Sequence, residues 1–155
     1  MIRVLFVCLG NICRSPMAEG LFTKRIKDLN LDNKIYVESC ATSSWEVGNS
    51  IHEGTKNILD QYEIDSKHMR AKQITNRDFE TFDYIIGMDQ NNVDTLISMN
   101  PNYKYKVYLY LDICVNNHKK SIFDPYYTHD FKKTYDDIIL AMDLWINKFI
   151  NDIKN

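Results

Sequence analysis

A cysteine and an arginine stand six positions apart near the start of the chain, as Cys8 and Arg14. A thiol beside a guanidinium and a helix N-terminus is stabilised as a thiolate, which is a strong nucleophile. The planar guanidinium also matches two oxygens of a phosphate group. Between them, Gly10 and Asn11 tolerate the positive φ that a tight loop around an anion needs. This spacing predicts phosphoryl transfer through a cysteinyl intermediate.

The flanking residues predict elements that would position this loop. The run 2–7 is apolar and rich in β-branched and aromatic residues, which indicates a buried strand. Ser15 is the predicted N-cap of a following helix, with Pro16 at its first position. A loop between a strand and a helix directs backbone N–H groups at one spot, which suits an anion. The nucleotide-binding pattern Gly-x-x-x-x-Gly-Lys-Ser/Thr is not matched, because the loop has no lysine.

A plainer interpretation treats Cys8 as a buried structural thiol and Arg14 as a surface charge. For an isolated cysteine and arginine at this spacing, that interpretation would be preferred. The preceding strand, the internal Gly-Asn pair and the following Ser-Pro pair favour the functional interpretation here.

The chain resembles the low-molecular-weight protein tyrosine phosphatases at two motifs. The first, near the N-terminus, is Cys8-Leu9-Gly10-Asn11-Ile12-Cys13-Arg14-Ser15-Pro16, and the second, near the C-terminus, is Asp124-Pro125-Tyr126-Tyr127. The resemblance covers nearly the whole chain. It implies a four-stranded parallel sheet with the phosphate-binding loop after the first strand, and it implies that Asp124 is the general acid and base. By itself an Asp-Pro pair usually marks only a turn.

The resemblance also implies roles for residues around these motifs. Ser15 is expected to donate a hydrogen bond to Cys8, and Asn11 to hold the strained loop together with Ser39. Further residues are expected to border the phosphate or the substrate cleft: Leu9, Gly10, Ile12, Cys13, Trp45, Asn49, Tyr126 and Tyr127. The three aromatic residues of that set would form a slot in which a phosphotyrosine ring stacks, deeper than phosphoserine reaches. For Trp45 alone, packing over the core is an equally good interpretation.

The chain departs from the family pattern at two places. Ser50-Ile51-His52-Glu53-Gly54 follows Asn49 where many members have Asp-Pro-Arg. Met69 stands where many members carry a histidine that supports the phosphate loop, and His68 lies one residue earlier.

Predicted strands and helices alternate along the rest of the chain. Strands are predicted at 2–7, 35–39, 84–88 and 106–111. Helices are predicted at 17–29, 52–62, 90–99 and 131–153, with Asp89 capping the third, and a short helix follows a capping-box pattern at Thr75. This alternation predicts a three-layer α/β fold in which helices cover both faces of a parallel sheet. Ligands in such folds bind at the carboxyl ends of the strands.

Length and composition limit the number of domains and the kinds of partner, location and cofactor that we expect. A chain of 155 residues predicts a single domain over 1–155, and a net charge of −2 gives no indication of nucleic acid or acidic lipid as a partner. We expect a cytoplasmic monomer without a membrane span or signal peptide, although export without such a signal stays open. The four histidines are scattered, so neither a metal site nor a cofactor is expected. The expected partners are tyrosine-phosphorylated proteins or small aryl phosphates.

Two rival functions and one further role stay open at this point. An arsenate reductase of the same fold would need a downstream cysteine pair, whereas Cys40 and Cys114 are far apart in the sequence. A non-catalytic phosphotyrosine-binding module would be expected to lack Cys8 or Asp124. Cys13 is either packing within the loop or a redox partner that traps oxidised Cys8 as a reversible disulfide.

Overall fold

Four parallel strands form the central sheet of the computed structural model, which describes residues 1–154. The strands are β1 (Ile2–Cys8), β2 (Ile35–Ala41), β3 (Tyr84–Gly87) and β4 (Val107–Leu109), and their order in the sheet is β2-β1-β3-β4. Each neighbouring pair is parallel. The predicted four-stranded parallel sheet is therefore confirmed. The last residue of the predicted domain, Asn155, lies outside the described residues.

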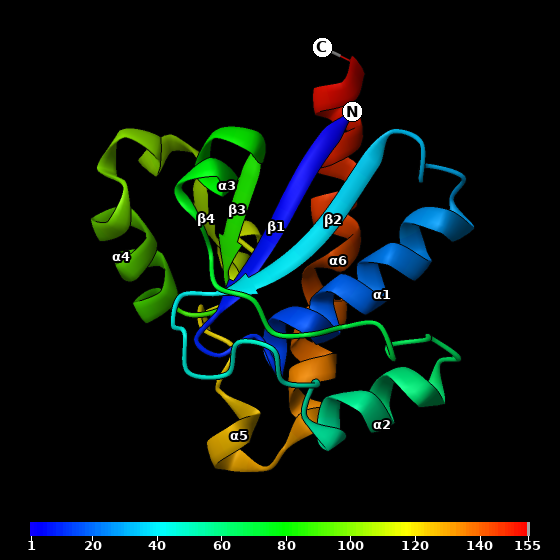
Figure 1. Ribbon diagram of the computed structural model, residues 1–155. Helices are drawn as coiled ribbons and strands as arrows, with labels where there is room; N and C mark the ends of the chain where they lie inside the picture. Colours follow the sequence, from blue (N-terminus) through cyan, green and yellow to red (C-terminus); the bar gives the residue numbers. More distant parts are fainter. Residues whose placement is uncertain (155) are drawn as a thin grey trace.

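The sheet is buried on both faces over most of β1, which explains why this strand is continuously apolar from Val4 to Cys8 rather than alternating. Val4 and Phe6 belong to the larger core cluster, whereas Leu5 and Val7 belong to the smaller cluster on the opposite face. Parallel strands need crossover connections, and the intervening helices supply them on both faces (Figure 1).

Within residues 1–154, six α-helices and two 3₁₀ helices accompany the strands. The α-helices are α1 (Arg14–Asp28), α2 (Glu53–Gln61), α3 (Asn76–Thr81), α4 (Gln90–Met99), α5 (Pro125–Thr128) and α6 (Phe131–Lys154), and the 3₁₀ helices are η1 (Pro101–Lys106) and η2 (Tyr110–Ile113). Figure 1 shows α1 and α6 on one side of the sheet and α4 on the other, with α2 and α5 near the end to which the strands point. No helix within residues 1–154 is both long and apolar enough to cross a membrane.

The long helix α6 anchors the larger core. Trp145 is almost fully buried, and its Nε1 donates to the Tyr110 carbonyl at 2.9 Å. The Tyr110 hydroxyl in turn donates to the Ile138 carbonyl at 2.6 Å, so the polar atoms of both aromatic residues are satisfied. The apolar residues that repeat at helical spacing along α6 were expected to face the sheet, and most are at least partly buried, whereas Ile139 is exposed.

Several predicted boundaries differ from the structure. Helix α1 begins at Arg14 rather than at Met17, and its N-cap is Cys13, so the prediction of Ser15 as the cap is wrong. The reason is that Ser15 uses its hydroxyl toward Cys8 rather than toward the helix N-terminus. Strand β4 ends at Leu109, because the chain turns into η2 there. The capping residues Thr75 and Asp89 are confirmed, each in a complete capping box.

The departure at residues 50–54 has a packing explanation. His52 caps α2 by accepting a hydrogen bond at Nδ1 from the Gly54 amide at 3.0 Å, and its ring stacks on Phe131 at a centroid distance of 4.8 Å. A Cβ at Gly54 would lie 2.4 Å from the Phe131 ring. The close approach of α2 to the start of α6 therefore requires glycine at this position.

Candidate active site

Cys8 is the last residue of β1. The carbonyl groups of the loop that follows accept hydrogen bonds from the backbone amides of neighbouring segments. The carbonyls of Cys8 and Leu9 accept bonds from the amides of Thr42 and Ser43 at 2.9 and 3.1 Å. Further along the loop, the Ile12 carbonyl accepts from the amide of His52 at 2.8 Å. Because the C=O and N–H of a peptide group point in opposite directions, carbonyls turned outward direct the loop amides inward, an arrangement that suits an anion.

Asn11 holds the loop in its curved conformation. Its φ of 58° lies in the left-handed region, which asparagine tolerates better than most residues. The Asn11 Nδ2 amide donates to Ser15 Oγ at 2.8 Å and to Ser39 Oγ at 2.9 Å. Ser15 Oγ lies 3.0 Å from Cys8 Sγ. The residues expected to support the loop are thus brought together behind the cysteine.

The guanidinium of Arg14 is buried, with a side chain that is 2% exposed. Its Nη1 donates to Asp89 Oδ2 at 2.6 Å and to the Ile122 carbonyl at 2.8 Å. Its Nη2 lies 3.5 Å from Asp124 Oδ2. Burial opposes the charge of Arg14, but Cys8 and Asp89 outweigh this effect and raise its pKa above the ordinary value. Within residues 1–154, the one buried side-chain nitrogen or oxygen without a hydrogen-bond partner is Arg14 Nε.

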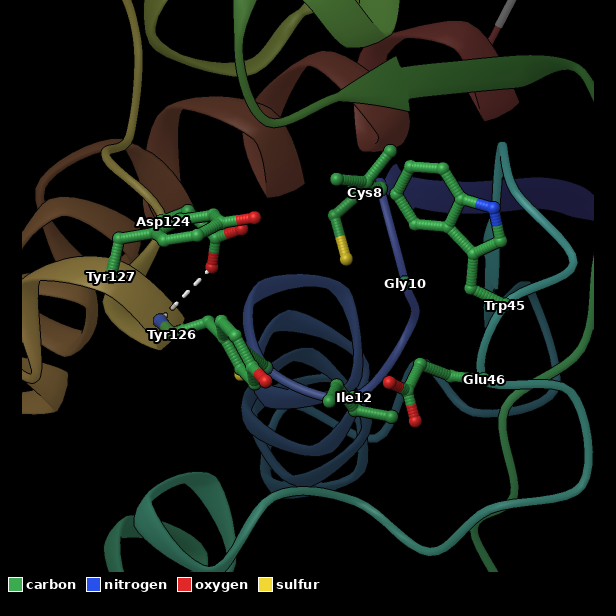
Figure 2. A pocket seen from close by; sticks show the side chains of 10 residues that line it. Cys8, Gly10, Ile12, Trp45, Glu46, Asp124, Tyr126 and Tyr127 are labelled. Carbon is green, nitrogen blue, oxygen red and sulfur yellow. Dashed lines mark hydrogen bonds between the residues drawn. The ribbon is translucent and has the colours of Figure 1, made fainter.

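Asp124 faces the cysteine from the start of α5. It is the N-cap of this short helix, and its Oδ1 accepts from the Tyr126 amide at 3.1 Å. Figure 2 shows the Cys8 sulfur pointing into the space between Asp124 and Trp45. A carboxyl group on the far side of this space can reach the leaving oxygen of a group bound at the sulfur.

The space is a small cavity of about 170 Å³, lined by Cys8, Leu9, Gly10, Ile12, Cys13, Trp45, Glu46, Asp124, Tyr126 and Tyr127. Trp45 and Tyr127 are 75% and 70% exposed, so neither is folded over the core. These aromatic side chains stand around the mouth of the cavity and offer apolar walls to a flat ring (Figure 2).

Asn49 does not line this cavity, contrary to the expectation. It is exposed and donates from Nδ2 to Glu46 Oε2 at 2.7 Å. Glu46 takes the place on the wall instead, and its side chain approaches Gly10. Asn49 thus contacts the cavity only through Glu46.

The remaining cysteines differ in environment. Cys13 lines the cavity, and burial, reinforced by the nearby Cys8, raises the pKa of its thiol far above the ordinary value. Cys40 is fully buried in the smaller core cluster, and burial likewise raises the pKa of its thiol. In the described part of the chain, no three His, Cys, Asp or Glu side chains are grouped as metal ligands.

Residues 3–154 match the family described as low molecular weight phosphotyrosine protein phosphatase. The chain belongs to this family.

Relatives and solved structures of the family align with nearly the whole chain. The low molecular weight protein-tyrosine-phosphatase PtpA of Staphylococcus aureus is 42% identical over 152 residues, which cover 98% of this chain and 96% of the relative. The crystal structure of YfkJ from Bacillus subtilis has a TM-score of 0.93 at 38% identity, covering 98% of this chain and 96% of that one. SP-PTP, a low molecular weight protein tyrosine phosphatase from Streptococcus pyogenes, has a TM-score of 0.85 at 43% identity, with coverages of 96% and 93%.

Three residues of the site were not predicted as site residues from the sequence. Asp89 was predicted only as a helix cap, yet its carboxylate also binds Arg14. The Lys72 amide donates to Asn11 Oδ1 at 3.1 Å. Because the backbone N–H makes this contact, the type of residue at position 72 does not indicate it. Glu46 follows Trp45 directly, so its place beside an expected cleft residue was a signal that could have been used.

Proposed function

We propose that this member of the family hydrolyses phosphotyrosine through a phosphocysteine on Cys8. The observation that supports this best is the unpartnered Nε of the buried Arg14. Asp89 and the Ile122 carbonyl bind Nη1, whereas Nη2 has the longer contact with Asp124 at 3.5 Å, so a phosphate can bind at the guanidinium edge formed by Nε and Nη2. Two parallel N–H groups on that edge match two oxygens of a phosphoryl group. A buried donor without a partner is costly, and a bound phosphate would remove that cost.

In the first step the Cys8 thiolate attacks phosphorus, while the bond from phosphorus to the tyrosyl oxygen breaks. Its electron pair goes to that oxygen, which takes a proton from Asp124. The loop amides and Arg14 stabilise the charge that develops on the transferred group. Ser15 stabilises the thiolate by donating a hydrogen bond to it.

In the second step water attacks the phosphocysteine. Asp124, now ionised, accepts a proton from that water, the bond between phosphorus and sulfur breaks, and the thiolate is restored as phosphate forms. The same carboxyl group therefore serves as acid and then as base.

The walls of the cavity support a preference for tyrosine. The cavity is small, and aromatic side chains border its mouth, so the ring of phosphotyrosine can stack while its phosphate reaches Cys8. The shorter side chain of phosphoserine would draw the peptide backbone against Trp45 and Tyr127. The substrates that we propose are tyrosine-phosphorylated proteins or small aryl phosphates.

Phosphate release from matched phosphotyrosine, phosphoserine and phosphoarginine peptides, in the presence of a chelator, tests this proposal. Phosphoarginine is included because Glu46 places a carboxylate on the cavity wall, where a guanidinium could pair with it. We expect turnover of phosphotyrosine in chelator and its loss in Cys8→Ser. Near-normal activity of the Cys8→Ser protein would contradict the mechanism, and a preference for either of the other peptides would contradict the substrate class.

The rival functions make different predictions. An arsenate reductase needs a downstream cysteine pair, but neither Cys40 nor Cys114 lines the cavity, and Cys40 is fully buried. Reduction of arsenate in the presence of thioredoxin would support that rival. A binding module would hold phosphotyrosine without releasing phosphate, so the same peptide assay distinguishes it.

A further inference from the structure

The hydrogen bonds behind Cys8 continue beyond Ser39 to a carboxylate on α1. Ser39 Oγ donates to Glu19 Oε1 at 2.7 Å and accepts from Asn11 Nδ2 at 2.9 Å. A serine hydroxyl has one proton, so donation to Glu19 leaves only its lone pairs for Asn11. Helix α1 and strand β2, which carry Glu19 and Ser39, lie side by side (Figure 1).

Asn11 could adopt two orientations of its amide in this chain. In the observed one, Nδ2 donates to both Ser39 and Ser15, while Oδ1 accepts from the Lys72 amide at 3.1 Å. In the flipped one, Oδ1 would accept the protons of both serines, and Nδ2 would face the Lys72 amide, so the hydrogen bond from Lys72 would be lost. The Ser15 proton would then point to Asn11 and not to Cys8. The observed orientation thus decides whether Cys8 receives a hydrogen bond.

Ser15 also has a competing acceptor within reach. Its hydroxyl lies 3.0 Å from Cys8 Sγ and 3.4 Å from the Cys40 carbonyl. A donor from Asn11 at 2.8 Å occupies one lone pair of Ser15 Oγ and restricts the rotation of the hydroxyl. The state of Asn11 is therefore transmitted to the sulfur through one rotatable proton.

Glu19 itself is half-buried and poorly solvated. Burial raises its pKa above the ordinary value, while the Ser39 hydrogen bond and the nearby Lys72 oppose that rise. Glu38 and His68 are the other charged or titratable groups that act on it. Glu19 borders a second cavity of about 480 Å³, together with Asn11, Ser39 and Lys72, and none of its lining residues lines the substrate cavity.

We propose that Glu19 is a positioning residue for the Cys8 thiolate, because it fixes the proton of Ser39 and so keeps Asn11 oriented as a double donor. Glu19 touches neither the substrate nor the sulfur and acts through Ser39, Asn11 and Ser15 in turn. The inference rests on the proposed function in one respect, that Cys8 is the thiolate nucleophile.

The direction in which the ionisation of Cys8 moves along the pH scale distinguishes this role from a purely electrostatic effect of the Glu19 charge. A negative charge near a thiol disfavours the thiolate, so removing it should make Cys8 ionise at lower pH. Loss of an acceptor that orients Asn11 should do the opposite, since the thiolate would lose part of its hydrogen bond from Ser15. Glu19→Ala removes both the charge and the acceptor, whereas Glu19→Gln removes the charge but keeps an acceptor oxygen.

The rate of Cys8 alkylation by iodoacetamide, followed against pH with peptide mapping, measures thiolate formation without turnover. In Glu19→Ala we expect the midpoint of this profile to move to higher pH by about half to one unit, a 3- to 10-fold slower alkylation below the midpoint. In Glu19→Gln most of that shift should be absent, because the glutamine keeps an acceptor oxygen for Ser39. Glu38→Ala is the matched control, because Glu38 borders the same cavity and pairs with the Lys72 side chain without touching the chain of hydrogen bonds.

Two outcomes would overturn the inference. A midpoint that moves to lower pH in both Glu19 variants would show electrostatics alone, and an unchanged midpoint in Glu19→Ala would show packing alone.

In a Ser39→Ala background, Glu19→Ala should add no shift, and an additive shift would also contradict the route. If the alanine protein does not fold, Glu19→Met fills the space without an oxygen acceptor and carries the same expectation. Alkylation that follows these expectations in a protein without phosphatase activity would contradict the proposed function and leave this inference standing.

Discussion

The Nη1 atom of Arg14 lies 2.6 Å from Oδ2 of Asp89, the residue that caps α4. This contact joins the phosphate loop after β1 to the end of the neighbouring strand β3. The same carboxyl group accepts from the Asn92 amide at 2.7 Å through its other oxygen, Oδ1. One side chain therefore fixes a helix terminus and the phosphate-binding guanidinium together. A mutation can therefore weaken the contact with Arg14 and still leave the N-cap of α4 in place.

Asp89→Asn should weaken phosphate binding more than it weakens the fold. Asparagine is also a good N-cap, so α4 should keep its start, but the charged partner of Arg14 is lost. We expect the inhibition constant for inorganic phosphate to rise about 10-fold or more, the loss of one charge-assisted hydrogen bond. Asp94→Asn, on the exposed side of the same helix, is the control and should leave this constant unchanged. Equal values for all three proteins would show that Asp89 does not hold Arg14 in place.

Asp124→Asn should lower kcat by about 10²–10⁴-fold on phosphotyrosine, the usual contribution of a general acid. The loss should be smaller for aryl phosphates whose leaving group needs no proton. The wild-type rate should be bell-shaped in pH, because the mechanism needs an ionised nucleophile and a protonated general acid at the same time. The asparagine variant should lose the decline at higher pH. If that decline persists unchanged, another group is the acid.

Removal of the exposed aromatic walls should affect phosphotyrosine selectively. Trp45→Ala and Tyr127→Ala each remove a ring at the mouth of the cavity, and a stacked aromatic pair contributes about 0.5–1.5 kcal/mol beyond its area. We expect kcat/KM for a phosphotyrosine peptide to fall by about 2- to 10-fold per ring, while the low activity on the matched phosphoserine peptide does not fall and rises where the removed ring had blocked the peptide backbone. Tyr105→Ala, an exposed tyrosine outside the cavity lining, is the control. A parallel loss on both peptides would exclude stacking as the source of selectivity.

Cys13 tests the predicted redox pair. Burial raises the pKa of its thiol, so at neutral pH it is protonated and a weak nucleophile. After peroxide converts Cys8 to a sulfenic acid, closure to a Cys8–Cys13 disulfide should therefore speed up as the pH rises, since only the Cys13 thiolate attacks. Dithiothreitol should restore wild-type activity more fully than that of Cys13→Ser. Equal recovery, with no linked peptide by mass spectrometry, would leave Cys13 as packing.

Much of this site could be predicted because its chemistry is local in sequence. Cys8, Asn11, Arg14 and Ser15 lie within eight consecutive residues, and the apolar run before them and the Ser-Pro pair at their end indicated the strand and the helix on either side. The contacts of Arg14 with Asp89 and Ile122 could not be read in this way, because they join residues 75 and 108 positions apart. Only the packing of β3 beside β1 brings them together.

Other misses arise where one residue type has two possible uses. Ser15 is a common N-cap residue, but its hydroxyl turns to Cys8, and a cysteine becomes the cap of α1 instead. Asn49 was expected in the cleft from the family pattern, whereas its amide binds the carboxylate of Glu46. In both cases the partner of a hydrogen bond decided the role, and residue type alone does not reveal that partner.

Direct detection of phosphocysteine is the most direct test of the central claim. Asp124→Asn should slow hydrolysis of the intermediate, so this variant can be mixed with an aryl phosphate that has a good leaving group and quenched within its first turnovers. Peptide mapping by mass spectrometry should then find one phosphoryl group on Cys8, in an amount that matches a burst of released phenol. The account predicts that this adduct disappears in a protein that also carries Cys8→Ser. Turnover with no adduct on Cys8, or a phosphoryl group on another residue, would contradict it.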